Sequence, residues 1–346
     1  MTKSTETSPF KVEPQKSASL LAPMEAEEAL SVREDLTQVV KKPLWRIRLE
    51  LFWRAIQTNV GLFAENRIGL VGLSIILFFA LLAIAHPILM ATVWDETTYD
   101  PVTGYAYDET RQPAPPSPRH LLGTDPLGRD VLSQLMFSTR AEFALGLIAA
   151  LITVTIATTI GAVSAYYGGL VDTLFMRIAD LIIMMPFISV LIVMSGLVDL
   201  DLIQLAFVIG TFAGFGGTTV IIKSQALAIS VKPFIEAARV AGGSHRHIIL
   251  THIIPNLLPL SFLYMMFTVT SAIFSEAVLS FFGLLNIRMS WGIMIYTAQT
   301  AGYLLSGAEY WWLLIPAGAS VTLLCAAFYL VGRALDEVVN PRLRKR

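Results

Sequence analysis

The sequence has few charged residues, and long stretches of it have none. Charged side chains make up 15% of the 346 residues, whereas hydrophobic side chains make up 55%, and the mean hydropathy is +0.64. A water-soluble domain of this size cannot hide so much apolar surface in its core. The composition therefore predicts a membrane protein, and the formal net charge of -1 gives no indication of a nucleic-acid partner.

The chain also lacks the residue patterns of an enzyme or an ATPase. It contains no His-Glu-x-x-His zinc motif, no Gly-x-Ser-x-Gly nucleophile motif and no glycine-rich phosphate loop ending in Lys-Ser or Lys-Thr. Its one cysteine, Cys325, lies among leucines and alanines, which favours a structural packing role. We expect no catalytic residue, no metal site and no cofactor on this chain, so active transport would take its energy from a partner protein.

The first 66 residues differ in composition from the rest. Residues 1–43 are rich in polar side chains and proline, which predicts a disordered tail. In residues 44–66, apolar side chains recur every three or four positions among several arginines, which favours an amphipathic helix at the membrane interface over a basic linker. The opening twenty residues contain no apolar segment, so we expect no secretory signal and insertion at an internal span.

Six stretches without charge are long enough to be membrane spans, which need about 20 apolar residues. They lie between Arg67 and Asp95, Glu142 and Asp172, Asp180 and Asp199, Asp201 and Lys223, Asn256 and Glu276, and Tyr310 and Arg333. The third is short and the fourth is rich in glycine, so either could be a broken helix. We predict an all-α membrane protein with six transmembrane helices.

The basic residues are distributed unevenly around these spans. With both termini on one side, 20 of the 25 Lys and Arg residues lie on that side, which the positive-inside rule assigns to the cytoplasm. The predicted segments are a first transmembrane helix (67–95), an extracytoplasmic loop (96–142), a permease core (143–335) with a cytoplasmic loop (224–255), and a basic tail (336–346). The outer loop is rich in proline and is expected to be an extended surface segment without its own core.

Ionisable side chains are nearly absent from the predicted spans. The exception is His86, whose place beside Pro87 near the outer end favours an interfacial position over a proton relay. Transporters driven by protons or sodium usually need ionisable groups at membrane depth, and no inverted repeat is visible. These observations do not favour a secondary transporter or channel without ATPase partners, which is the alternative function. An intramembrane enzyme would need catalytic residues that the sequence lacks.

The cytoplasmic loop carries signals for two helices separated by glycines. Pro233 suits the first turn of a helix, because its missing N–H falls where no intrahelical bond forms, and Gly242 suits the end of that helix. Ser244 is a candidate N-cap for a second helix over residues 245–254, ending before Pro255. The residues alone leave open whether this hairpin is structural or docks a partner.

Four segments resemble the second permease type of dipeptide, oligopeptide and nickel importers driven by ATP-binding-cassette ATPases. The EAA motif of that family is similar to Glu236, Ala237, Ala238, Gly242 and Pro255, with His252 and Ile254 departing from the general pattern. The G-T-D-x-x-G-R-D motif is similar to the segment containing Gly123, Asp125, Gly128, Arg129 and Asp130. The other two segments are 276–292, with Leu285 replacing a glycine, and 336–342, with Asn340 replacing an aspartate.

The resemblance extends from about residue 60 to 344 and implies the type I importer permease fold with a cytoplasmic coupling helix. It implies one half of a translocation pathway in the cytoplasmic (inner) membrane, paired with a second related permease, two ATPases that bind ATP and Mg, and an extracytoplasmic solute-binding protein. The EAA residues would couple the permease to the ATPases, and the outer motif would serve structure or permease pairing. Peptides are the first expectation for the solute, followed by nickel chelates and oligosaccharides, and the residues that bind it are not identified.

Overall fold

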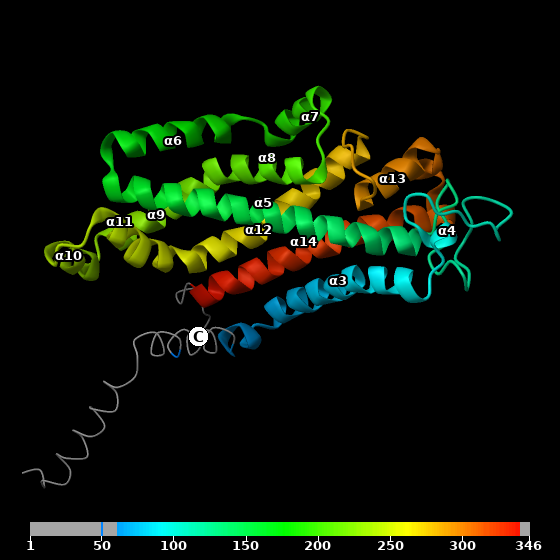
Figure 1. Ribbon diagram of the computed structural model, residues 1–346, viewed down its shortest axis with the longest axis horizontal. Helices are drawn as coiled ribbons and strands as arrows, with labels where there is room; N and C mark the ends of the chain where they lie inside the picture. Colours follow the sequence, from blue (N-terminus) through cyan, green and yellow to red (C-terminus); the bar gives the residue numbers. More distant parts are fainter. Residues whose placement is uncertain (1–49, 51–60, 340–346) are drawn as a thin grey trace, which may run out of the picture. The chain divides into compact units, whose positions relative to one another are not determined.

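The computed structural model describes Glu50 and residues 61–339 (Figure 1). The chain falls into two units, Met1–Gly61 and Leu62–Arg346, and each described helix that could cross a membrane belongs to the second. The predicted tail (1–43), most of the predicted interfacial helix (44–66) and the last residues of the predicted basic tail lie outside the described residues.

Helices account for nearly all of the regular structure in the described part of the chain. Four are long and apolar enough to cross a membrane: α3 (Arg67–Thr92), α5 (Val131–Tyr167), α12 (Ile254–Phe281) with the turns before it, and α14 (Trp311–Val339). Two bent pairs also qualify: α6 (Gly169–Met184) with α7 (Phe187–Leu197), and α8 (Leu202–Phe215) with α9 (Gly217–Ser230). The short elements are α4 (Glu96–Tyr99), α10 (Pro233–Val240), α11 (His245–Ile248), η1 (Ile249–Ile253), α13 (Trp291–Thr300), η2 (Tyr303–Leu305) and η3 (Gly307–Tyr310).

The third and fourth predicted spans are the two broken ones, as their sequences indicated. The axis bends by 83° between α6 and α7, where Pro186 is the extended residue that precedes α7. Proline has no N–H to continue the ladder of a preceding helix, and it disfavours the helical conformation in the residue before it. Between α8 and α9 the bend is 41°, at Gly216. With each bent pair taken as one span, the described residues contain the predicted six.

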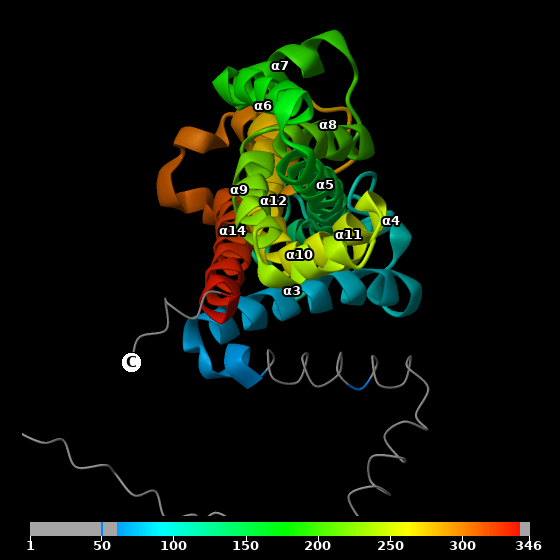
Figure 2. The same cartoon turned by 90° about the vertical axis from the view of Figure 1, so that its left-hand side faces the viewer.

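The helix α5 lies at the centre of the fold (Figure 2). It packs against α3, α8, α9 and α12, and small residues let these neighbours approach closely. A Cβ atom added at Gly146 would lie 2.6 Å from a side-chain methyl of Val269 on α12, and one at Gly161 would lie 2.9 Å from the backbone nitrogen of Lys223 on α9. The largest buried residue beside α5 is Trp291, whose indole N–H donates to the carbonyl oxygen of Leu135 at 3.1 Å.

The long helices run side by side, so the fold has two ends (Figure 1). We call the end formed by α10 and α11 the hairpin end. We call the opposite end, formed by residues 93–130 and α13, the loop end. The EAA motif lies at the hairpin end and the outer motif lies at the loop end, so the long helices separate the two motifs.

The predicted boundaries of the second and fifth spans are wrong. The helix α5 begins at Val131, well before Glu142, and α12 continues past Glu276 to Phe281. Both glutamates therefore lie inside helices, and both are fully buried, with 0% exposure. The expectation that almost no ionisable group lies within the spans therefore fails for these two glutamates.

The prediction of an extended surface loop over residues 96–142 is also wrong. Ala106, Ala114 and His120 are buried, and the segment folds against the long helices. The indole N–H of Trp312 on α14 donates to the carbonyl oxygen of Thr124 at 3.2 Å. The segment becomes compact through hydrogen bonds and glycine turns, which proline-rich composition does not reveal.

Candidate functional site

The first helix of the hairpin has the bounds that its sequence predicts. Pro233 occupies the first turn of α10, and Lys232 before it is extended. The helix ends at Val240, and Gly242 just beyond its C-cap has a φ angle of +81°, which glycine adopts without steric cost. The backbone N–H of Gly243 then donates to the carbonyl oxygen of Ala238 at 3.0 Å, which closes the turn.

The second helix of the hairpin begins as predicted but does not end before Pro255. The hydroxyl oxygen of Ser244 accepts a hydrogen bond from the backbone N–H of His247 and caps α11. A wider π turn, η1, then leads directly into α12, and Pro255 lies in the first turn of that helix. Proline is tolerated in this first turn. Residues 245–281 therefore form one continuous helical span.

The EAA residues lie mainly on the outer surface of the hairpin. Glu236, Ala237, Gly242 and Pro255 are exposed, whereas Ala238 is half-buried against the cluster that contains Ile235. A Cβ atom added at Gly242 would meet nothing within 4 Å. The exposed face of α10 is therefore free of large side chains at Ala237 and Gly242, although Glu236 lies beside Arg239 at 3.5 Å.

The hairpin is fixed to the membrane helices by packing on two sides. Ile235 of α10 and Ile248 of α11 are both fully buried in a cluster shared with α9, α12 and α5. On the other side, the ring of His245 stacks on Tyr167 at the end of α5, with ring centroids 5.7 Å apart. The guanidinium of Arg239 lies 5.2 Å above the ring of neighbouring Tyr166. A displacement of α10 would consequently be transmitted to both α5 and α12.

The outer motif forms a tight turn at the loop end. Gly123 and Gly128 have φ angles of +72° and +83°, which favour glycine. One carboxylate oxygen of Asp125 accepts hydrogen bonds from the backbone N–H groups of Leu127 and Arg129, each at 2.9 Å. This is the turn-forming role that aspartate performs in such loops.

The charges of the outer motif are paired inside the turn and not exposed as a lone ion pair. The second carboxylate oxygen of Asp125 accepts hydrogen bonds from Nε of Arg129 at 2.7 Å and from Nε2 of Gln134 at 2.9 Å, and Nη2 of Arg129 lies 2.5 Å from the same oxygen as an ion pair. Asp125 is 5% exposed and Arg129 is 8% exposed. The pair is thus buried and linked by a charge-assisted hydrogen bond, which is stronger than one between neutral groups.

Asp130 joins the turn to the central helix. Its Oδ1 caps α5 by accepting from the backbone N–H of Ser133 at 2.7 Å, and its Oδ2 lies 2.9 Å from Nδ1 of His120. His120 also lies 3.4 Å from Asp108, so two carboxylates flank its buried ring. The hydrogen bond to Asp130 raises the pKa of His120, although burial acts in the opposite direction. No local sequence pattern pointed to His120.

These contacts are structural, because they hold the loop end against α5. The carboxylates of Asp125 and Asp130 accept hydrogen bonds from side chains, from backbone N–H groups and at a helix cap, whereas Nη2 of Arg129 has no hydrogen-bond partner among the described residues. Within residues 61–339, no three side chains of His, Cys, Asp or Glu gather as a metal site would require. The arrangement offers no activated nucleophile and holds the loop end on α5.

Comparison with known proteins shows the family of this chain. Residues 157–345 match the family described as binding-protein-dependent transport system inner membrane component. The chain belongs to this family. It is 31% identical to a dipeptide transport system permease of Bacillus subtilis, over 81% of this chain and 84% of the relative. It is also 31% identical to an oligopeptide transport system permease of Haemophilus influenzae, over 82% of this chain and 87% of the relative.

The fold is accordingly the type I permease fold, and the chain is a transport subunit and not an enzyme. Two other residues that stand out in the sequence of this permease have packing contacts. His86, near the loop end of α3, is 4% exposed, so it is buried against Phe137 and does not face the interface. Cys325 packs against the largest buried cluster, with its Sγ 3.6 Å from the carbonyl oxygen of Thr270.

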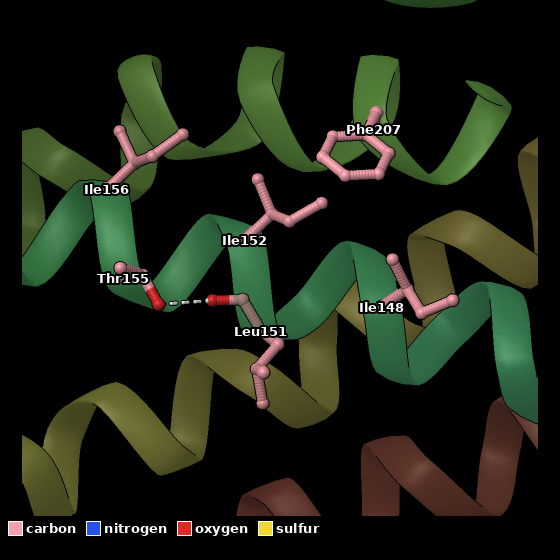
Figure 3. A pocket seen from close by; sticks show the side chains of 6 residues that line it. All are labelled: Ile148, Leu151, Ile152, Thr155, Ile156 and Phe207. Atoms are coloured by element: carbon pink, nitrogen blue, oxygen red, sulfur yellow. Dashed lines mark hydrogen bonds between the residues drawn. The ribbon is translucent and has the colours of Figure 1, made fainter. Parts of the chain in front are cut away.

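The permease carries an apolar groove midway along α5 (Figure 3). The groove has a volume of about 300 Å³ and is lined by Ile148, Leu151, Ile152, Thr155 and Ile156 of α5 with Phe207 of α8. Its one hydroxyl, that of Thr155, donates to the carbonyl oxygen of Leu151 at 2.7 Å and is thus already satisfied. The groove suits lipid tails or apolar side chains and not a polar solute.

Proposed function

We propose that this permease forms half of the translocation pathway of an ATP-driven importer for peptides or similar small solutes. The proposal is supported by relatives named as dipeptide and oligopeptide transport permeases, similar over more than four fifths of the chain. The distribution of basic residues supports a cytoplasmic position for the hairpin end and both termini, and a position outside the cytoplasmic membrane for the loop end.

The hairpin would couple this permease to its ATPases. Glu236, Ala237 and Gly242 present a surface of low relief, which a groove on a partner could approach closely. ATP and Mg would bind on two partner ATPase subunits. When those subunits close, the displacement of the hairpin would pass into α12, because residues 245–281 are one continuous helix. That continuity is the observation that carries the proposal.

Two further partners belong to the proposed importer. An extracytoplasmic solute-binding protein would deliver its solute at the loop end. A second related permease would complete the pathway.

One observation favours a second candidate, a secondary transporter without ATPases. Glu142 and Glu276 are ionisable groups buried inside the helical bundle, which such a transporter would need. Purified permease in liposomes, given a solute gradient but no ATP and no partner proteins, should transport nothing if the importer function is correct. Solute uptake under these conditions would support the second candidate.

The coupling role is tested by the substitution Ala237→Leu. Ala237 is exposed and outside the buried cluster, so the added side chain should block docking without disturbing the fold. The half-buried Ala238 is a poorer probe, because enlarging it would also disturb the packing of the hairpin. We expect Ala237→Leu to lower co-purification of the ATPases, uptake and substrate-stimulated ATP hydrolysis together.

The matched control is Ala228→Leu, the same change at an exposed alanine of α9 outside the EAA motif. It should leave all three measurements unchanged. If Ala237→Leu retains the ATPases and full uptake, the hairpin is not the coupling element.

A further inference from the structure

The centre of the fold contains two carboxyl groups that no part of the proposed transport mechanism uses. Glu142 on α5 and Glu276 on α12 lie where these helices pack against each other. The hydrogen bond between Thr158 and Ser261 and the close approach of Gly146 to Val269 set the register of this antiparallel contact, and the same register brings Glu142 opposite Glu276. Both are 0% exposed. They are separated by more than a hundred residues of sequence, so only the fold brings them together.

Three of the four carboxyl oxygens of the pair have no hydrogen-bond donor among the described residues. Ser280 Oγ donates to Oε1 of Glu276 at 2.5 Å, but Oε2 of Glu276 and both oxygens of Glu142 have no donor among the described residues. An ionised carboxylate only accepts hydrogen bonds, so two carboxylates cannot satisfy each other. Leaving such groups buried and unpaired is strongly unfavourable.

The surrounding helices supply no compensating cation. Arg140 on α5 is exposed, and the titratable side chain of Cys325 on α14 is a thiol, which carries no positive charge. On α3, His86 contacts Ser133 and Phe137 instead. The sequences of α8 and α13 contain no Asp, Glu, Lys, Arg or His, and Lys223 on α9 pairs with Asp172 at 2.5 Å.

We propose that Glu142 and Glu276 form a proton-binding site in which one proton is shared between the two carboxyl groups. A single proton turns one group into a donor for the other, which satisfies oxygens that have no other partner and leaves one negative charge in place of two. Two carboxyl groups and a hydroxyl are fewer than the six or so oxygen ligands that a hard divalent cation takes. A proton is the ligand that fits.

The site fastens α5 to α12, the helix that continues from the hairpin. If α5 and α12 separate at this contact during transport, the shared hydrogen bond breaks and the proton is exposed to exchange. This consequence rests on the proposed coupling function. The proton site itself does not, because it can be measured in the resting assembly.

Infrared spectroscopy of the assembled transporter in lipid at neutral pH tests the site directly. The wild type should show the C=O stretching band of a protonated carboxyl group, shifted when H₂O is exchanged for D₂O. Glu142→Gln should remove that band, because its amide donates to Glu276 without a titratable proton. Glu309→Gln, at an exposed glutamate of the loop end, is the control and should keep the band. If the band is missing from the wild type, or persists in Glu142→Gln, the proposal is wrong.

Thermal unfolding of the same assemblies provides a second test. Raising the pH removes the shared proton and leaves two facing carboxylates, so the Tm of the wild type should fall with a component that is missing in Glu142→Gln. Both proteins should respond equally to added Na⁺. A wild-type Tm that rises with Na⁺ while that of Glu142→Gln does not would overturn the proposal in favour of a cation site, and identical pH profiles would overturn it as well. Neither test requires transport activity, so failure here is distinguishable from failure of the importer function.

Discussion

The substitution Asp125→Asn should release the loop end of the permease from α5. The asparagine oxygen can still accept from the backbone N–H groups of Leu127 and Arg129, so the turn keeps part of its framework. Its NH₂ group, however, would face the guanidinium of Arg129 and the amide N–H of Gln134, both of which are donors. The change therefore leaves a buried positive charge without its partner.

The expected loss of stability in Asp125→Asn is large because the ion pair is buried. Removing one partner of a buried ion pair destabilises a protein by about 3 to 5 kcal/mol. The exposed pair formed by Arg177 and Asp180, with side chains 77% and 55% exposed, serves as the comparison. Breaking an exposed pair of this kind costs about 0 to 1 kcal/mol. Asp180→Asn is thus a matched control of the same chemistry.

Hydrogen exchange of the assembled transporter in lipid measures the local stability of the loop end in the two variants. A loss of about 3 kcal/mol or more in the local opening free energy raises the open population by about a hundredfold or more. We expect peptides covering residues 120–131 to exchange faster by this factor in Asp125→Asn, whereas Asp180→Asn should leave them unchanged. Equal exchange rates in the two variants would refute the claim that the buried pair of Asp125 and Arg129 stabilises the loop end.

Two further predictions concern the ends of the molecule. The hydrogen bond to Asp130 and the contact with Asp108 raise the pKa of His120 above its usual value of 6.5, so the stability that they give is full below that value and is lost as the pH rises through the raised pKa. Once corrected for the intrinsic pH dependence of amide exchange, hydrogen exchange in the loop end should accelerate as the pH rises through the raised pKa in the wild type and should not do so in His120→Gln. In a Cys325→Ala background, Thr110→Cys should react with an impermeant thiol reagent in intact cells and Ser244→Cys only after permeabilisation, and the reverse pattern would contradict the proposed orientation.

Features encoded by local sequence could be predicted. Pro233 and Gly242 bound α10 because a missing N–H and a missing Cβ act within one turn of the residue that carries them. The breaks near Pro186 and Gly216 follow from the same local chemistry. The resemblance in the EAA and outer motifs indicated the family, which the comparisons confirm.

Features that depend on contacts between distant residues could not be predicted. Pro255 looked like the end of a helix, since the π turn that carries the chain into α12 has no local signature in the sequence. The order of the loop end depends on His120 meeting carboxylates on either side of it in the sequence, so composition alone suggested an extended segment. Glu142 and Glu276 were used to mark span ends because each was read as an isolated charge, and only their pairing explains how both are buried.

The buried acidic groups near α5 differ in how their oxygens are satisfied, and this difference separates structural roles from a ligand site. Asp125 has a guanidinium, a side-chain amide and two backbone N–H groups, and Asp130 has a histidine and a helix cap. Each has the donors that a buried carboxylate requires, so neither needs anything from outside the chain. Glu142 has no donor among the described residues and faces a second acceptor, Glu276. All four acidic side chains are buried, so burial alone does not distinguish them. The missing donor assigns the proton to the contact between α5 and α12 and not to the loop end.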